Sequence, residues 1–182
     1  MTWALVYAVL LAALVLRFRA PDAPMLEPAH PVPDEPLRLV AVHHILFYAL
    51  LLGSPLEAAF AGGVAPARGT GAALFGAGVL AYRLGGRALG EALSPFVEPR
   101  AGTALVTVGP YRWVRHPMYL GQAAIAVGAP LTLGCRWTLV VSAAALVVLA
   151  IRVVLEEGAL ARTFPEYSLY AAKSKRFVPF LF

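Results

Sequence analysis

Residues 103–121 read TALVTVGPYRWVRHPMYLG and lie between two long apolar runs. Five side chains that readily form hydrogen bonds fall within nine residues of this stretch: Tyr111, Arg112, Arg115, His116 and Tyr119. Pro117 opens the apolar run that follows, and proline is tolerated in the first turn of a helix, because the N–H that it lacks would be unpaired there. The stretch therefore predicts a helix that begins at Pro117. Free backbone N–H groups at such a start suit an anionic ligand group.

A simpler interpretation of this stretch is a positively charged loop whose aromatic side chains anchor it at a membrane interface. Arginine or lysine alone would satisfy that interpretation. The stretch also carries the pattern His-Pro-x-Tyr-x-Gly at residues 116–121, which a loop of that kind does not require. We therefore interpret it as part of a functional site.

The composition points to a membrane protein rather than a soluble domain. Of the 182 residues, 60% are hydrophobic and 14% are charged, and the mean hydropathy is +0.73. In so apolar a chain, a net charge of +5 indicates orientation in a membrane and attraction to anionic lipid rather than nucleic-acid binding. The length fits a single membrane domain over residues 1–182. The single cysteine, Cys135, excludes an internal disulfide and a cysteine-based metal cluster.

Five apolar runs are candidates for transmembrane helices: residues 1–16, 37–60, 70–84, 117–134 and 137–155. The first run carries its charges after the apolar core, at Arg17 and Arg19, which is unlike a signal peptide. We therefore expect an all-α integral membrane bundle of about five transmembrane helices. Residues 1–85 would supply the N-terminal spans, and residues 86–182 the half that carries the motifs.

The segments between these runs have their own signals. Residues 20–36 hold six prolines and are predicted to form an extended loop. Residues 85–102 are polar enough to lie outside the hydrocarbon. Within the third run, the small residues Gly71, Gly76 and Gly78 would let helices approach closely in lipid.

His43 and His44 are adjacent in the second run. Neighbouring side chains on a helix point about 100° apart, so this pair is not expected to bind one metal ion. We expect an interfacial or interhelical hydrogen bond instead, and no metal site elsewhere in the chain.

Only Cys135 and Arg136 separate the last two runs, which predicts a tight antiparallel hairpin. This hairpin would bring residues 115–119 next to residues 152–157. With five spans, Arg68 and Arg136 fall on one side of the membrane and the remaining 13 of the 15 lysines and arginines on the other. The positive-inside rule then puts the amino terminus outside and the carboxyl terminus in the cytoplasm. High use of alanine, and of arginine over lysine, favours a bacterial inner membrane.

Arg152 and Glu156 are four residues apart and share one face of a helix. Ionisable groups near the hydrocarbon are candidates for function. The alternative is an interfacial salt bridge between these two residues, with Glu157 as a solvated acid.

Two blocks of sequence resemble a known family. Residues 109–121, GPYRWVRHPMYLG, resemble the signature of the isoprenylcysteine carboxyl methyltransferases, integral-membrane enzymes related to phospholipid methyltransferases. Glu156-Glu157, followed by Phe-Pro-Glu-Tyr at 164–167 and by Tyr170, resembles the C-terminal signature of that family. Residues 1–85 match only in hydropathy.

The resemblance implies S-adenosylmethionine as cofactor and methyl transfer to a membrane-soluble or lipidated acceptor, with the cofactor pocket formed by the C-terminal hairpin. Carried over by position, the cofactor contacts would be Thr103, Ala104, Leu105, Val106, Tyr111, His116, Pro117, Met118, Tyr119 and Glu156. Arg152 matches an arginine at the substrate and is the expected catalytic residue. Arg176 is expected near a carboxylate of the substrate or the cofactor. The carboxyl methyltransferases often have histidine where Thr103 stands.

Several alternatives stay open from sequence alone. A phospholipid or an amine is an alternative acceptor to a carboxylate. An NADPH-dependent membrane reductase would use Arg112, Arg115 and Arg176 to hold a phosphate, although the chain lacks the Gly-rich loop of soluble dinucleotide-binding folds. A membrane scaffold that binds a solute is the non-enzymatic alternative. The amphipathic tail, residues 161–182, either lies on anionic lipid or closes over the cofactor pocket.

Overall fold

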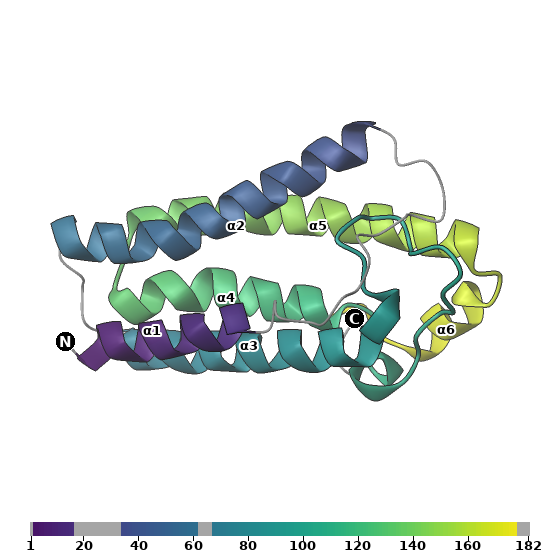
Figure 1. Ribbon diagram of the computed structural model, residues 1–182, viewed down its shortest axis with the longest axis horizontal. Helices are drawn as coiled ribbons and strands as arrows, with labels where there is room; N and C mark the ends of the chain where they lie inside the picture. The colour runs from purple at the N-terminus through teal and green to yellow at the C-terminus, as the bar shows by residue number, and fades with distance from the viewer. Residues whose placement is uncertain (1, 17–33, 62–66, 178–182) are drawn as a thin grey trace.

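The computed structural model describes residues 2–16, 34–61 and 67–177. These residues form a helical bundle without a named strand, which confirms the all-α class (Figure 1). The helices are α1 (Thr2–Val15), α2 (Asp34–Ala61), α3 (Arg68–Leu89), α4 (Pro117–Leu133), α5 (Trp137–Thr163) and α6 (Tyr167–Lys173). Two short 3₁₀ turns, η2 (Gly90–Ala92) and η3 (Gly109–Arg112), lie in the long connection between α3 and α4.

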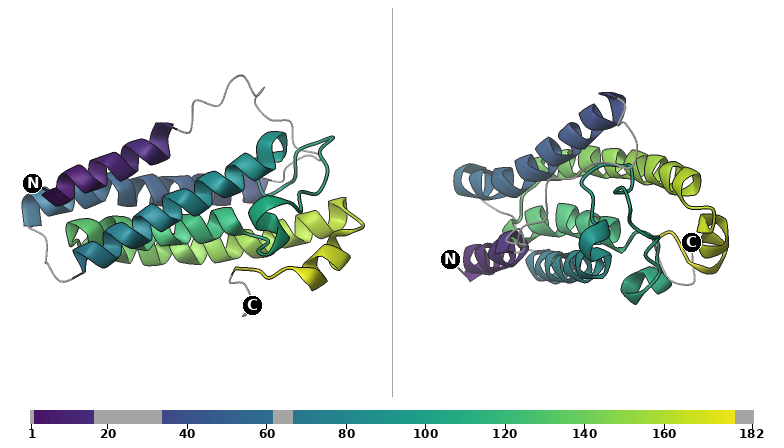
Figure 2. Two further views of the ribbon diagram at one scale, coloured as in Figure 1. Left: turned by 90° about the horizontal axis from the view of Figure 1, so that it is seen from below. Right: turned by 45° about the vertical axis from the view of Figure 1, so that its right-hand side comes forward.

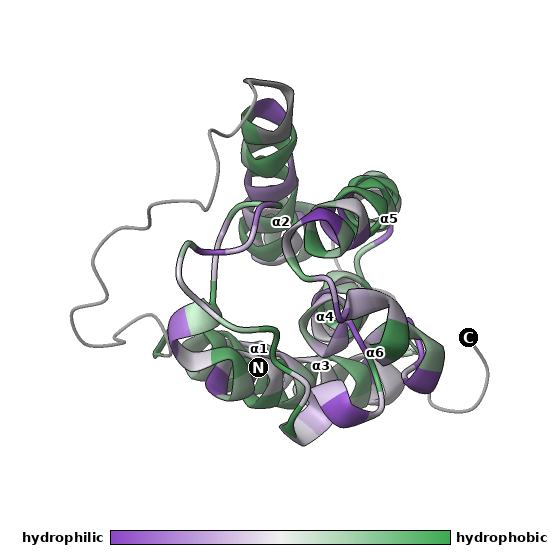
Figure 3. Cartoon of the chain, turned by 90° about the vertical axis from the view of Figure 1, so that its right-hand side faces the viewer, coloured by the Kyte–Doolittle hydropathy of each residue, from purple (hydrophilic) through white to green (hydrophobic). Residues whose placement is uncertain are grey.

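Helix α4 is the centre of the bundle. It packs against α1, α2, α3 and α5, and its most extensive interface is with α3. Figure 2 and the end view in Figure 3 show α4 between the pair α1–α3 and the pair α2–α5. Successive long helices run in opposite directions, so the start of α4 and the end of α5 lie at the same end of the bundle (Figure 1). This end is called the site end below.

Two described helices are long and apolar enough to cross a membrane by length and composition: α2 over Leu37–Ala61 and α5 over Trp137–Thr163. Helix α1 is apolar but has only 14 residues. Val140, Val147 and Val154 form an exposed apolar stripe along α5, as expected for a lipid-facing surface. Green turns are seen along both α2 and α5 in Figure 3. The structure thus confirms a helix at each predicted run and supports membrane association, whereas five crossings stay a prediction.

Helices α3 and α4 approach each other through glycines. A Cβ atom on Gly78 would stand 2.7 Å from the carbonyl oxygen of Gly121, and one on Gly121 would stand 2.7 Å from that of Gly78. Two turns away, a Cβ on Gly71 would lie 2.5 Å from the backbone of α4. The predicted role of Gly71 and Gly78 in close approach is confirmed. Gly76 faces α1 instead, where the nearest atom, on Leu10, would be 3.7 Å from an added Cβ.

The predicted hairpin between α4 and α5 is confirmed. Gly134 ends α4 with a φ of +76°, a left-handed conformation that glycine adopts without strain. Glu57 of α2 then holds the start of α5, because its carboxylate accepts the backbone N–H groups of Arg136 (2.7 Å), Trp137 (2.9 Å) and Thr138 (2.7 Å). The first N–H groups of a helix have no partner within it, so this carboxylate acts as a cap supplied by another helix.

Three boundaries differ from the prediction by three residues or more. Helix α5 continues to Thr163, whereas the predicted run ends at residue 155. Helix α2 begins at Asp34 rather than at residue 37, which is compatible with Pro36 because proline is tolerated in a first turn. Helix α3 continues to Leu89, five residues beyond the end of the predicted run over residues 70–84. Gly85 is buried there, and a Cβ on it would lie 2.6 Å from the side chain of Met118. The predicted division between residues 85 and 86 falls within α3.

Some predictions concern residues outside the described part of the chain. They are residues 20–33 of the loop predicted over residues 20–36, the charges at Arg17 and Arg19, and the last five residues of the tail, 178–182. The loop prediction is wrong for residues 34–36, which begin α2.

Candidate active site

At the site end, the start of α4 meets the end of α5. His116 is the residue before α4 and is 2% exposed. Its Nε2 atom lies 3.3 Å from Oε1 of Glu157, and its Nδ1 atom lies 3.9 Å from Oε1 of Glu156. Since a carboxylate oxygen accepts, Nε2 carries the hydrogen in the bond to Glu157. The predicted meeting of the two sequence blocks is confirmed.

One turn into α4, the buried hydroxyl of Tyr119 donates a short hydrogen bond to Oε2 of Glu156. The Glu156 side chain is 26% exposed, and its other oxygen makes no hydrogen bond within residues 2–16, 34–61 and 67–177. This carboxylate is held in place on one side and has capacity for a ligand on the other.

Glu157, the next residue, has a different role. Its Oε1 atom accepts hydrogen bonds from Nε of Arg115 (3.0 Å), Nε2 of His116 (3.3 Å) and Nε of Arg176 (3.2 Å). A further short bond from Arg176 reaches Oε2. This hydrogen bonding to Glu157 raises the pKa of Arg176 above its ordinary value. Glu157 therefore joins α5 to the start of α4 and to the C-terminal tail.

His116, Tyr119, Glu156 and Glu157 are called the Glu156 cluster below. The C-terminal tail runs beside residues 113–116 and covers part of this cluster. The N–H of Arg115 donates to the carbonyl of Lys175 (2.7 Å), and the N–H of Lys175 donates to the carbonyl of Trp113 (2.9 Å), as in a short parallel bridge. The ring of Phe177 then lies 6.1 Å from the ring of His116. The tail was predicted either to lie on anionic lipid or to close over the cofactor pocket. Its described part, up to residue 177, lies against the site.

Arg152 is almost fully buried, with 4% of its surface exposed. Its Nη2 atom donates to the carbonyl of Pro95 (2.9 Å), and its guanidinium carbon lies 5.6 Å from the centre of the Tyr119 ring. No ion pair joins Arg152 to Glu156 in the described residues, so the alternative of a salt bridge between them is wrong there. The Nε atom of Arg152 has no hydrogen-bond partner within the same residues. Such buried unpaired groups are uncommon in folded proteins and indicate a ligand or water contact.

The structure does not join every predicted cofactor residue to this cluster. Four of them lie together in the connection before η3: Thr103, Ala104, Leu105 and Val106. The hydroxyl of Thr103 donates to the carbonyl of Arg100 (2.8 Å). Among the described residues, no hydrogen bond links residues 103–106 to the Glu156 cluster.

The other predicted residues sit around the start of α4. Tyr111 is buried in η3, and its carbonyl accepts the hydroxyl of Tyr170 (2.8 Å). Burial raises the pKa of Tyr170, which keeps its hydroxyl protonated as that donor. Pro117 is the first residue of α4, as predicted, and Met118 packs against Gly85 of α3.

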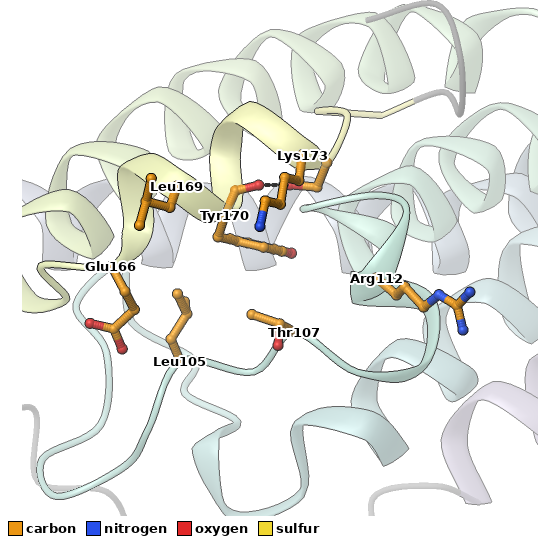
Figure 4. A pocket seen from close by; sticks show the side chains of 8 residues that line it. Leu105, Thr107, Arg112, Glu166, Leu169, Tyr170 and Lys173 are labelled. Carbon is orange, nitrogen blue, oxygen red and sulfur yellow. Dashed lines mark hydrogen bonds between the residues drawn. The ribbon is translucent and has the colours of Figure 1, made fainter.

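A pocket of about 340 Å³ adjoins this cluster, between residues 105–112 and α6 (Figure 4). It is lined by Leu105, Thr107, Arg112, Glu166, Leu169, Tyr170, Lys173 and Ser174. Leu105 is the one predicted cofactor residue in this lining. The pocket touches the cluster through Ser174, whose carbonyl accepts a hydrogen bond from Arg115 (2.5 Å).

Arg115 and Glu157 are not among the cofactor contacts predicted from sequence. The signal that would have identified their pairing is the doublet of acids. Adjacent side chains on a helix diverge by about 100°, so one acid can serve Tyr119 while the other serves the cations. Which acid takes which partner depends on the tertiary packing of α4 and the tail.

Comparison with known proteins identifies the family of this chain. The nickel-cobalt-cadmium resistance protein NccN of Alcaligenes xylosoxydans xylosoxydans is 34% identical over 90 residues, which are 46% of this chain and 40% of that protein. The chain thus spans well under two thirds of the length of that relative. A sequence model of the family described as phospholipid methyltransferase matches residues 67–167, which include α3, α4, α5, the first motif block and the second block as far as Tyr167. This chain belongs to the phospholipid methyltransferase family, within the group of membrane methyltransferases that its sequence resembles.

Proposed function

We propose that the protein transfers a methyl group from S-adenosylmethionine to a membrane-soluble or lipidated acceptor. The observation that carries this proposal is the meeting of His116 and Tyr119 with Glu156, because it joins both motif blocks inside the range matched by the family. The family assignment favours methyl transfer over the reductase and the scaffold considered from sequence.

The donor is a zwitterion with an ammonium group, a carboxylate and a sulfonium, and the residues present fit it. Glu156 has one oxygen held by Tyr119 and one oxygen without a hydrogen bond in the described residues, which suits an ammonium group. The start of α4 and the partly exposed Arg176 suit a carboxylate. When bound, the donor supplies an electrophilic methyl group on a good leaving group. The protein then has to orient two reactants and exclude water.

In this proposal the other predicted cofactor contacts come from residues 103–106, Tyr111, Pro117 and Met118. Arg152 orients the acceptor, because its guanidinium lies beside Tyr119 and carries an N–H group without a hydrogen-bond partner in the described residues. The acceptor enters laterally between helices from the lipid.

The topology is part of the proposal. All five long helices cross the membrane, and the site end, which gathers most of the lysines and arginines, faces the cytoplasm of a bacterium. The amino terminus is then outside and the carboxyl terminus inside. Methyl donors of this class are cytoplasmic, so this orientation puts Glu156 on the side from which the donor comes.

A second candidate is methylation of a phospholipid amine, which the family match favours. It differs from carboxyl methylation in one chemical requirement. A carboxylate attacks the methyl group without losing a proton, whereas an ammonium group has to be deprotonated first.

Calorimetry of the purified protein with S-adenosylhomocysteine and with NADPH tests the proposed function. We expect S-adenosylhomocysteine to bind and NADPH not to bind. Binding of NADPH alone would contradict methyl transfer. Incubation with radiolabelled S-adenosylmethionine and membrane lipid should then label a base-stable amine product or a base-labile ester, which separates the two candidates.

A further inference from the structure

His43 lies in α2, outside the range matched by the family, and is 2% exposed. Its Nδ1 atom is buried and has no hydrogen-bond partner among the described residues. The adjacent His44 is different, because its Nδ1 atom lies 2.8 Å from the carbonyl of Val40 in the same helix. The two neighbouring histidines therefore differ. The Nδ1 atom of His44 has a hydrogen-bond partner in its own helix, and the Nδ1 atom of His43 has none among the described residues.

The position of His43 connects it to the proposed acceptor site. Helix α2 packs against α5, the helix that carries Arg152. The ring stacks on Phe47, with 6.1 Å between ring centres. One turn nearer the site end, Val40 packs with Val97 and Ala159 in a buried apolar cluster. His43 thus lies on the inner side of an apolar contact, on the helix that packs against the one carrying the buried Arg152.

Two buried groups on facing helices therefore have unused hydrogen-bonding capacity: Nδ1 of His43 and Nε of Arg152. Both side chains are more than nine-tenths buried. Polar atoms buried between helices in an apolar environment are unfavourable unless they find a partner, and ionisable groups at membrane depth mark ligand sites by default. The Nε group of arginine donates and cannot accept, so its partner must be an oxygen acceptor.

We propose that His43 is a positioning residue for the methyl acceptor, and that together with Arg152 it holds an oxyanion of the acceptor head group between α2 and α5. The acceptor class is then a lipophilic molecule whose head carries a carboxylate or a phosphate. This inference rests on the proposed function and names the substrate class of the same site. A histidine from α2 would give this chain a specificity contact that the matched range 67–167 does not contain.

Three probes with one chain length test the head group: laurate, dodecyl phosphate and dodecylamine. Their binding to the full-length protein in a neutral detergent is measured by calorimetry with S-adenosylhomocysteine present. We expect the two oxyanions to bind and the amine to bind at least roughly ten-fold more weakly, since hydrogen bonds to charged groups contribute about that factor or more. Preference for laurate identifies a carboxylate acceptor, and preference for dodecyl phosphate identifies a phospholipid head.

Variants then test His43 itself. His43→Phe keeps a ring but removes Nδ1. It should weaken binding of the favoured oxyanion by roughly ten-fold or more. His43→Asn places an amide atom where Nδ1 stands and should retain most of the affinity, whereas His43→Gln, whose amide lies one bond further out, should not. His44→Phe is the matched control and should bind like the wild type. Once an acceptor that the protein methylates has been identified, His43→Phe should raise the KM for that acceptor and leave kcat nearly unchanged.

The outcomes separate the inference from the proposed function. If His43→Phe and His43→Gln both bind the oxyanion with wild-type affinity, the role of His43 is overturned. It is also overturned if the His44→Phe control loses as much oxyanion affinity as His43→Phe. Preferred binding of dodecylamine would overturn the oxyanion class. Should His43→Phe misfold, as judged by loss of S-adenosylhomocysteine binding, the comparison of His43→Asn with His43→Gln decides the same question. Failure of the wild type to bind S-adenosylhomocysteine would instead overturn the proposed function, and this inference with it.

Discussion

Two carboxylates tie helices together at opposite ends of the bundle, and they do so differently. Glu57 accepts three backbone N–H groups at the start of α5 and also the hydroxyl of Thr138 (2.7 Å). Glu156 accepts one hydroxyl, from Tyr119, and its other oxygen makes no hydrogen bond within the described residues. The first carboxylate is saturated by groups fixed in the fold, and the second is held but not saturated.

The difference separates a structural charge from a charge available to a ligand. A backbone N–H at a helix start needs an acceptor whatever the protein binds, so Glu57 has no reason to release its partners. At the site end, Glu156 and Glu157 accept hydrogen bonds from side chains. Within the described residues, one oxygen of Glu156 and the Nε atom of Arg152 have no hydrogen-bond partner. The two ends therefore predict opposite effects of substitution on stability and on ligand binding.

The largest expected effect is on turnover, at Arg152. Arg152→Ala should leave the affinity for S-adenosylhomocysteine nearly unchanged while kcat/KM falls by about 30-fold or more, because loss of a buried charged partner costs about 2–5 kcal/mol. Arg152→Lys should restore little, since a point charge does not replace the planar guanidinium. Thermal unfolding in detergent and cofactor titration are measured for both variants. A full rescue by lysine would reduce the role of Arg152 to charge alone.

The next effect is on stability, between the two ends. Gly78→Ala puts a methyl group 2.7 Å from the carbonyl oxygen of Gly121, so α3 and α4 have to move apart. We expect it to lower the free energy of unfolding by about 1–3 kcal/mol, as overpacking does. Gly76→Ala is the matched control, because its nearest neighbour would be 3.7 Å away. Equal unfolding temperatures for the two variants would show that the helices are not in the close contact described.

The smallest effect is expected at Arg176, at the rim of the site. Its side chain is 45% exposed, whereas that of Arg115, on the same carboxylate, is 13% exposed. An exposed ion pair contributes about 0–1 kcal/mol, so Arg176→Ala should change the unfolding temperature little. Arg115→Ala should change it more, because Arg115 also donates to the carbonyls of Ala171 (2.8 Å) and Ser174 (2.5 Å). Unfolding curves recorded side by side check this order, and a reversed order would contradict the tail arrangement.

Local sequence signals predicted much of this fold. Runs of apolar residues located the five long helices, Pro117 located the start of α4, and the two-residue link at Cys135 and Arg136 required a hairpin. That hairpin in turn predicted that His116 and Tyr119 would meet Glu156, which the structure confirms. Each of these predictions depends on contacts between residues near in sequence, or on one short turn.

What sequence missed depends on contacts between distant residues. The predicted run ends at residue 84, yet Gly85 packs on Met118 and stays inside α3. Arg152 and Glu156 are correctly spaced for an ion pair on a helix, but Arg152 bonds to Pro95, 57 residues away. Glu57 caps a helix whose first turn is 79 to 81 residues further along the chain. Spacing along one helix carries no information about such partners.

The most direct test of the account measures two matched variants, Glu156→Gln and Glu57→Gln, by calorimetric titration with S-adenosylhomocysteine and by thermal unfolding in the same detergent. Glu156→Gln should weaken binding by roughly 10- to 150-fold, the range for loss of a charge-assisted hydrogen bond, with little change in unfolding temperature. Glu57→Gln should do the reverse, destabilising the fold by about 0.5–2 kcal/mol as loss of a helix cap does, with wild-type affinity. Wild-type affinity in a folded Glu156→Gln variant would contradict the assignment of the donor site to the meeting of α4 and α5.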